Sequence, residues 1–197
     1  GFESIKSVPP SFLKYSAAKH INFVGSKSLT ELPPKFMSGC GAAVQISFKN
    51  VDAITSIGDN FLNESQHLET LEFCGFRSLK TLPDDFMKYS GVKRIHLDGN
   101  ECVTSIGNGF LSNTSKLEEV TFAGFKGLTK LPDNFLNGCK AKCIVFKNVD
   151  TIVEIGRCFL NNTSNLEEFE FAGFNSLTKL PESFLSHSNV RRIIFRD

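Results

Sequence analysis

The sequence predicts a β-rich solenoid of eight coils over residues 1–197, expected to form one domain. Three observations support this fold class. A Phe followed by Leu or Met recurs every 24 or 25 residues, a second row of Phe recurs at the same interval, and a turn-forming residue follows the second row two positions later. A fixed period of this length is typical of proteins whose coils each bury one face against their neighbours.

The first Phe row marks the same place in every coil. Each Phe follows Pro-x-x or Gly-x-x, and Pro suits the first position of a helical turn because its missing N–H leaves no bond unmade there. We therefore expect a short helical turn at each member of the row. The row comprises Phe12, Phe36, Phe61, Phe86, Phe110, Phe135, Phe159 and Phe184.

The second Phe row ends a short strand in each coil. Apolar and polar residues alternate before it, as in LETLEF, LEEVTF and LEEFEF, which predicts a strand with one buried face. Strands of successive coils are expected to pair in parallel. The row comprises Phe23, Phe48, Phe73, Leu97, Phe122, Phe146, Phe171 and Phe195.

Only Gly, Asn or Asp stands two residues after the second row. These residue types tolerate a positive φ, so the chain is expected to turn sharply there. A second, shorter extended segment is expected to follow, as between Leu128 and Leu131. The turn row comprises Gly25, Asn50, Gly75, Gly99, Gly124, Asn148, Gly173 and Asp197.

The repeat explains all twenty Phe residues. Those outside the two rows are Phe169, which lies in a predicted strand, and the Phe residues of four Gly-Phe pairs. No Phe is left for a separate aromatic binding site. The four pairs contain Phe2, Phe76, Phe125 and Phe174.

Two kinds of coil alternate from the third coil onwards. Coils with Ile-Gly are centred on Phe61, Phe110 and Phe159, and coils with Leu-Pro lie between them, which makes a period of 49 residues. A pair of coils is therefore predicted to be the unit that duplicated. The first two coils are both of the Pro kind.

The stretches ITSIGDNFLNESQHLETLEF and VTSIGNGFLSNTSKLEEVTF resemble the repeats of BspA-like surface leucine-rich repeat proteins, with Phe at many Leu positions. Cys40 and Cys139, three residues after the Met or Leu of the pair, match a frequent Cys of that family. The resemblance implies a leucine-rich-repeat array and a non-catalytic binding protein, often an adhesin, that is secreted or lies on the cell surface. Leu-Pro coils such as LTKLPDNFL also look like repeats of intracellular immune receptors and bacterial effectors, so a cytoplasmic location stays open.

Composition excludes several classes of partner. The net charge is +1, so bulk charge indicates no nucleic acid, and no apolar run approaches the ~20 residues of a membrane span. We therefore expect no membrane insertion of this chain. It begins in the middle of a repeat phrase at Gly1, which predicts an excerpt of a longer protein.

The six cysteines are predicted to be free, buried thiols. None has a Cys at the matching phase of an adjacent coil, and a bridge between Cys139 and Cys143 is the weaker alternative. This pattern favours a reducing compartment.

Sequons for N-glycosylation follow the Phe-Leu pair of the Ile-Gly coils. They are candidate glycosylation sites if the protein is secreted, but duplication copies a sequon with its repeat, and the same Asn, Ser and Thr residues also suit turns. The sequons begin at Asn63, Asn113, Asn161 and Asn162.

No catalytic or metal-binding pattern stands out. His20, His67, His96 and His187 lie in different coils and at different phases, so no pair has the spacing of metal ligands. The glycines follow the coil period and form no phosphate-binding loop. We expect no enzyme, no cofactor and no metal.

The strand face is the predicted recognition surface, for a protein or a glycan. Strands after Ile-Gly coils are acidic and those after Leu-Pro coils are basic, so neighbouring strands carry opposite charges and Arg94, Glu119, Glu168 and Arg192 are expected to be mainly structural. A ligand would instead contact the remaining outward positions or the loops. The candidates are Thr70, Glu72, His96, Thr121, Val145, Glu170 and Ile194. The alternative is a spacer or stalk that binds no specific ligand.

Overall fold

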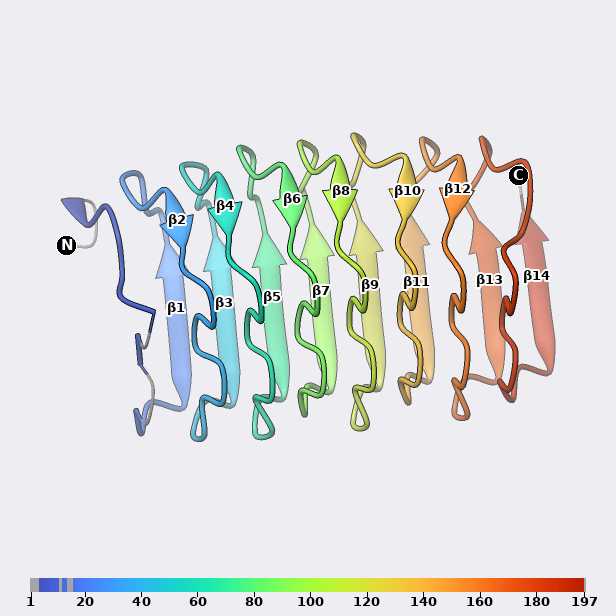
Figure 1. The fold of residues 1–197 in the computed structure, drawn as a ribbon, viewed down its shortest axis with the longest axis horizontal. Helices are drawn as coiled ribbons and strands as arrows, with labels where there is room; N and C mark the ends of the chain where they lie inside the picture. The colour runs from blue at the N-terminus through green and yellow to red at the C-terminus, as the bar shows by residue number, and fades with distance from the viewer. Residues whose placement is uncertain (1–3, 11, 14–15, 197) are drawn as a thin grey trace.

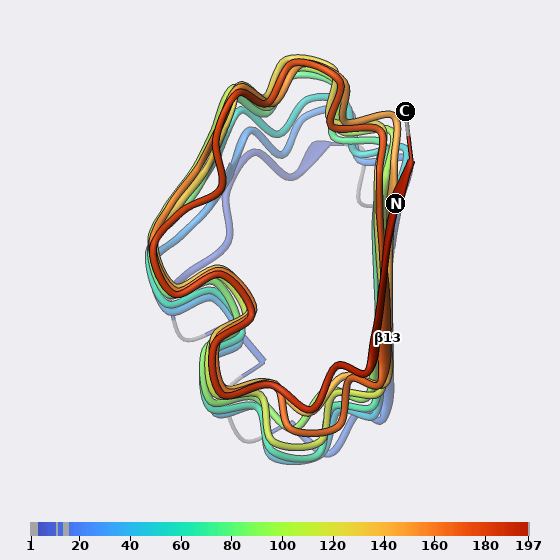
Figure 2. The same cartoon turned by 90° about the vertical axis from the view of Figure 1, so that its right-hand side faces the viewer.

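The computed structural model describes residues 4–10, 12–13 and 16–196 and is a parallel β-solenoid, which confirms the predicted fold class (Figure 1). One five-residue strand stands in each predicted coil. Viewed along the stack, the coils superpose and the long strands form one straight side (Figure 2). These strands are β1 (His20–Val24), β3 (Gln45–Lys49), β5 (Thr70–Cys74), β7 (Arg94–Asp98), β9 (Glu119–Ala123), β11 (Cys143–Lys147), β13 (Glu168–Ala172) and β14 (Arg192–Arg196).

The long strands pair in parallel and in phase, because each coil buries the same positions. Phe23 lies opposite Phe48, Phe48 opposite Phe73, and Leu97 opposite Phe122. Strands β1, β3, β5, β7, β9 and β11 form a six-stranded sheet, while β13 and β14 form a separate two-stranded sheet.

Six two-residue strands form the second extended segments. They pair in twos: β2 with β4, β6 with β8, and β10 with β12. The strands are β2 (Glu31–Leu32), β4 (Ser56–Ile57), β6 (Thr81–Leu82), β8 (Ser105–Ile106), β10 (Lys130–Leu131) and β12 (Glu154–Ile155).

The alternation of Ile-Gly with Leu-Pro produces this pairing. The N–H of Gly107 donates to the Leu82 carbonyl of the preceding Leu-Pro coil at 2.9 Å, and that of Gly156 donates to Leu131 at 2.9 Å. At the same phase of a Leu-Pro coil stands a proline, such as Pro83, which has no N–H to donate to the coil before it. The ladder therefore breaks after every second coil.

Steric contact also requires the glycine at this phase. A Cβ on Gly107 would lie 2.4 Å from the backbone nitrogen of Asp84, and one on Gly58 would lie 2.3 Å from that of Pro34. The backbone of the Leu-Pro coil therefore fills the space that a side chain would need.

The predicted helical turns are wrong. Across the described residues the structure contains no α-helix, and the segments around the first Phe row alternate in handedness instead. Asn60, Leu62 and Glu64 have φ of 59°, 52° and 57°. This conformation directs the N–H groups of alternate residues to opposite sides of the coil. Leu62 donates to Phe36 of the preceding coil at 3.1 Å, and Glu64 donates to Lys88 of the next coil at 3.3 Å.

The core consists of stacked Phe rings. In the first row, Phe86, Phe110 and Phe135 stack with centroid separations of 5.3 Å and 4.9 Å, and each of these side chains is fully buried. The Gly-Phe pairs add a second stack within one coil, because Phe125 lies 4.0 Å from Phe122. Phe2 lies outside the described residues.

The predicted turn row is confirmed. Gly75, Gly124 and Gly173 have φ of 76°, 71° and 74°, and Asn50 and Asn148 have φ of 54° and 55°. Asp197 lies outside the described residues.

Candidate ligand-binding face

The long strands present three columns of outward side chains. Because the pairing is in phase and inward and outward positions alternate, residues at one phase stack from coil to coil. The middle column of the six-stranded sheet comprises Asn22, Ser47, Glu72, His96, Thr121 and Val145.

The predicted binding residues fall mainly on this middle column. Glu72 lies opposite His96, His96 opposite Thr121, and Thr121 opposite Val145. Glu170 and Ile194 take the same phase in the two-stranded sheet. Thr70 belongs to the neighbouring column, opposite Arg94.

The carboxylate of Glu72 is engaged within the fold. It accepts a hydrogen bond from the Ser47 hydroxyl at 2.8 Å and pairs with the Lys49 ammonium at 2.7 Å. The bond from Lys49 is the first cause of the lowered pKa of Glu72, and that from Ser47 is the second. Glu72 therefore links two coils.

Ion pairs join neighbouring coils of opposite charge. Lys93 lies 2.7 Å from Glu69, and Arg192 lies 3.2 Å from Glu168. Arg94 pairs with Glu118 at 3.9 Å rather than with its register partner Glu119. These pairs are exposed, so they favour the correct register more than they add stability.

The charge alternation is interrupted at the sixth coil. Lys142 and Lys147, which precede and end β11, are exposed and make no ion pair within the part of the chain that the structure describes. The acidic residues of the next coil do not reach them: Glu168 pairs with Arg192 on its other side.

The main sheet opens at the same place, between β11 and β13. At the six other junctions between long strands, the carbonyl of the residue just before the strand accepts two N–H groups from the next coil. The Glu118 carbonyl, for example, accepts from Lys142 at 2.8 Å and from Cys143 at 3.0 Å. Among the described residues, the carbonyl of Lys142 has no such partner from Glu167 or Glu168.

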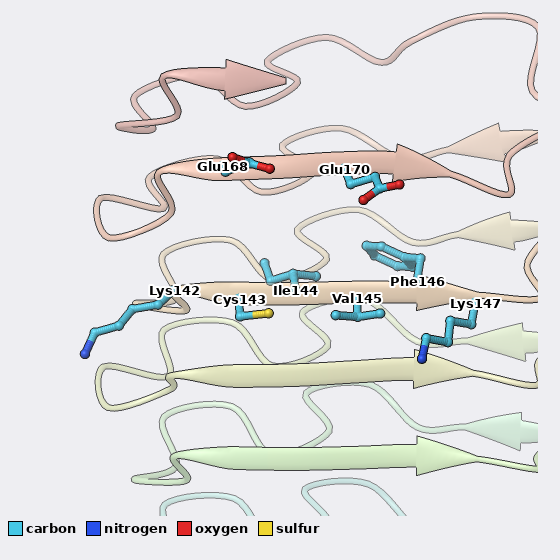
Figure 3. Close-up of a pocket in the computed structure, with 8 residues that line it drawn as sticks. All are labelled: Lys142, Cys143, Ile144, Val145, Phe146, Lys147, Glu168 and Glu170. Carbon is cyan, nitrogen blue, oxygen red and sulfur yellow. The ribbon is translucent and has the colours of Figure 1, made fainter. Parts of the chain in front are cut away.

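We call this opening the seam. It holds a cavity of about 390 Å³ lined by Lys142 to Lys147, Glu168 and Glu170 (Figure 3). The turn segments of the same coils stay bonded, since Leu160 donates to Phe135 at 3.1 Å and Gly138 donates to Asn161 at 2.8 Å. The seam is therefore a local gap in the strand face of a continuous stack.

Phe169 accounts for the seam. The inward residue at this phase is aliphatic in the other coils, as Val120 is in β9 and Ile144 in β11, whereas β13 places a Phe there. The Phe169 ring packs edge-on against Phe146 at 6.1 Å and Phe159 at 6.3 Å. This larger ring holds β13 away from β11. The sequence LEEFEF shows the Phe at this phase. It predicts a gap only when the positions of the Phe146 and Phe159 rings beside it are known.

All six cysteines are free thiols, as predicted. Only Cys40 and Cys139 are buried; Cys74, Cys102 and Cys158 are partly exposed and Cys143 is exposed on β11, which corrects the expectation of six buried thiols. Cys143 points outward because its phase on the strand is that of Glu119 on β9.

The sequons differ in their exposure. Asn113 and Asn162 are exposed, whereas Asn63 and Asn161 are half-buried and each has a buried Oδ1 atom. Asn113 and Asn162 are therefore the more accessible of the four sequon residues.

The described residues hold neither a cluster of metal-binding side chains nor a membrane-spanning helix. Within the described residues, no group of three or more His, Cys, Asp or Glu side chains could hold a metal ion. The described part of the chain also has no helix with the length and apolar character needed to cross a membrane.

Comparison with known proteins identifies the repeats. A family model described as BspA type Leucine rich repeat region matches in six copies over residues 3–94 and 80–197. None of the curated proteins compared with the chain matches it.

Two solved structures are similar to this chain. A leucine-rich repeat protein from Bacteroides ovatus ATCC 8483 is 20% identical over 89% of this chain and 56% of its own, with a TM-score of 0.49. The chain therefore spans about half the length of that protein. The T. pallidum leucine-rich repeat protein is 18% identical over 82% of this chain and 80% of its own, with a TM-score of 0.27.

Proposed function

Because the chain belongs to the BspA-type leucine-rich repeat family, we propose that it is a non-catalytic binding module that recognises a protein or a glycan through its strand face. The residues proposed to contact the ligand are Glu72, His96, Thr121 and Val145 of the middle column, with Thr70 beside them. Glu170 and Ile194 would extend the contact beyond the seam.

One observation carries the proposal. The side chains of His96, Thr121 and Val145 are register neighbours on the outward face, and within the described residues they make no hydrogen bond or ion pair. The charged residues beside them are largely engaged with one another, as Lys93 is with Glu69. The stretch of the middle column from His96 to Val145 is therefore the part of this face whose side chains are not engaged in hydrogen bonds or ion pairs within the described part of the fold.

The experiment is a screen of the purified chain on protein and glycan arrays, followed by affinity measurement with two face variants. Thr121→Arg and His96→Ala should each weaken binding of the selected ligand by about tenfold, as loss of a central contact does. Ser105→Arg, an exposed change on β8, is the matched control and should leave binding unchanged. Absence of any ligand, or equal binding by all three variants, would overturn the proposal.

The proposed location is the cell surface or the extracellular medium. The surface proteins of the family support it, while the six free thiols favour a reducing compartment and so a cytoplasmic location as the second candidate. Antibody labelling of intact cells, compared with permeabilised cells, separates the two.

A spacer function is the second candidate, and the Phe stack favours it. A ring ladder through the coils, with Phe61 stacked on Phe86 at 5.0 Å, makes a stiff rod whose length scales with the number of repeats. A spacer would bind nothing on the arrays and would tolerate Thr121→Arg.

A further inference from the structure

We propose that the loop end of the seam binds a neutral sugar, one hydroxyl group of which bridges the coils of β11 and β13. Lys142, Ser164, Asn165 and Glu167 line a pocket of about 450 Å³ at this end, which lies within the size range of ligand sites. We call it the loop pocket. It lies outside the middle column, so the inference goes beyond the proposed function and the two proposals can fail separately.

Backbone groups at the loop pocket lack the partners that their counterparts have elsewhere. At the closed junction before the seam, the Glu118 carbonyl accepts the N–H groups of Lys142 and Cys143 at 2.8 Å and 3.0 Å. At the seam, among the described residues, the N–H groups of Glu167 and Glu168 have no such acceptor, and the Lys142 carbonyl receives neither of them. Two donors and one acceptor are therefore left open at this end of the strands.

A hydroxyl group satisfies two donors and one acceptor at once. Its oxygen has two lone pairs that accept the two N–H groups, and its O–H donates to the carbonyl. A carboxylate cannot donate to the carbonyl, and an ammonium group cannot accept from the N–H groups. Water has the same capacity as a hydroxyl, but a sugar brings further hydroxyl groups that can bond to the rest of the loop pocket.

The width of the seam admits one oxygen atom and excludes a peptide chain. The Phe169 ring contacts the Phe146 ring at 6.1 Å across the seam, and Phe146 and Ile144 are each only 6% exposed. The interior side is therefore closed. One bridging oxygen lengthens the separation of the N–H nitrogen and the carbonyl oxygen from about 2.9 Å to roughly 5 Å, which requires only a small opening at the edge.

Side chains of the loop pocket provide the remaining contacts and favour a neutral ligand. In the part of the chain that the structure describes, the Lys142 ammonium and the Glu167 carboxylate make no ion pair, and their charges are opposite. The Lys140 ammonium donates to the Ser164 hydroxyl at 2.6 Å, which joins the loops of the two coils and fixes one wall. Asn165 adds an exposed amide. Several hydroxyl groups on one ligand can donate to the carboxylate and accept from the ammonium and the amide.

The probes are the methyl glycosides of glucose, galactose and mannose, titrated into the intact, isotope-labelled chain and followed by two-dimensional NMR. At least one of them should shift the amide signals of Glu167 and Glu168 saturably. The amides of Glu118 and Glu119, which donate to the Lys93 carbonyl at a closed junction, are the internal reference and should not shift. The permethylated form of the same glycoside accepts but cannot donate, so it should bind about tenfold more weakly.

Variants separate the side chains of the loop pocket from its backbone. Glu167→Ala and Asn165→Ala should each weaken binding of the glycoside by about fivefold, as loss of one polar contact does. Glu118→Ala removes an exposed carboxylate beside a closed junction and is the matched control. Phe169→Val, which is expected to close the seam, should abolish binding although every side chain that lines the loop pocket remains.

Three results would overturn the inference. The first is no saturable shift at Glu167 and Glu168 with any of the three glycosides, which would leave water as the bridge. The second is equal binding of the permethylated form. The third is unchanged affinity in Glu167→Ala and Asn165→Ala. Failure of the proposed function would look different, because His96→Ala should weaken binding of the array ligand and leave the glycoside bound, whereas Glu167→Ala should do the reverse.

Discussion

At the scale of single residues, backbone conformation and close contact decide which amino acid each coil can hold. The residues of the turn row have positive φ, which favours Gly. Asn50 and Asn148 show that a residue with a side chain can also adopt this conformation there. The space beside each glycine is what differs. A Cβ on Gly124 would lie 2.7 Å from the backbone nitrogen of Gly99, whereas one on Gly75 would lie 3.6 Å from that of Asn50.

We therefore predict that Gly124→Ala is more destabilising than Gly75→Ala. Gly75→Ala should cost about 1 kcal/mol of unfolding free energy through its left-handed conformation. Gly124→Ala should cost about 2–3 kcal/mol, because overpacking against the preceding coil adds to the same strain. Urea denaturation of the two variants measures the difference, and equal costs would show that the close contact relaxes freely.

Thiol reactivity is predicted to follow position in the coil. Burial raises the pKa of Cys139 to about 11, so its thiol stays protonated and inaccessible at pH 8. Cys143 is exposed, although partial burial of its sulfur and the nearby Glu119 also raise its pKa. Iodoacetamide should therefore modify Cys143 first and Cys139 only after unfolding, as followed by peptide mass mapping. Similar rates at the two cysteines in the folded chain would contradict the assigned burial.

At the scale of elements, the size of one inward side chain decides whether two strands pair. Phe169 and Phe171 both lie in β13. Phe171 belongs to the second Phe row, whereas Phe169 stands at a phase that holds an aliphatic residue in the other coils. Across the β11–β13 junction the Phe146 ring contacts Phe169 at 6.1 Å, whereas across the β9–β11 junction it contacts its register partner Phe122 at 5.7 Å. The sheet therefore divides into six strands and two.

Phe169→Val is predicted to close the seam. With the smaller side chain, the N–H groups of Glu167 and Glu168 should reach the Lys142 carbonyl, and amide exchange in residues 143–147 should slow by about tenfold. The converse variant, Val120→Phe, should speed exchange in β9 and its neighbours. Hydrogen exchange with mass spectrometry measures both. Unchanged exchange in both variants would mean that ring size does not set the gap.

At the scale of the whole molecule, the stack is continuous on its turn side and divided on its strand side. Bonds such as that from Leu185 to Phe159 at 3.1 Å hold the last coils to the rest. Stability in such an array is the sum of coil and neighbour contributions, so a weak junction becomes the boundary of a cooperative unit.

We predict a step in protection at that boundary. Residues 168–172 and 192–196 should exchange together, about tenfold faster than residues 119–123, because β13 and β14 can open without disrupting the six-stranded sheet. Hydrogen exchange across the folded chain at low denaturant tests this. A smooth decline towards both ends, without a step between β11 and β13, would count against a separate unit.

The sequence by itself determined the coil boundaries, the buried rows, the parallel strands and the turns with positive φ. Each of these depends on residues close together in the chain: strand alternation has a period of two, and Gly or Asn at a turn reports its own φ. That is why Phe122 and Gly124 could be placed from sequence alone.

Only the tertiary structure decided the conformation of the turn segments, the pairing of the short strands and the position of the seam. These features depend on contacts between residues one coil apart. The segment around Leu62 alternates in handedness since its N–H groups bond to the coils on either side, which a local helix could not do. The short strands pair in twos because Gly107 can donate to the coil before it and Pro83 cannot. The seam exists because Phe169 meets Phe146 across the stack. These contacts join positions about 24 residues apart, so no local pattern encodes them.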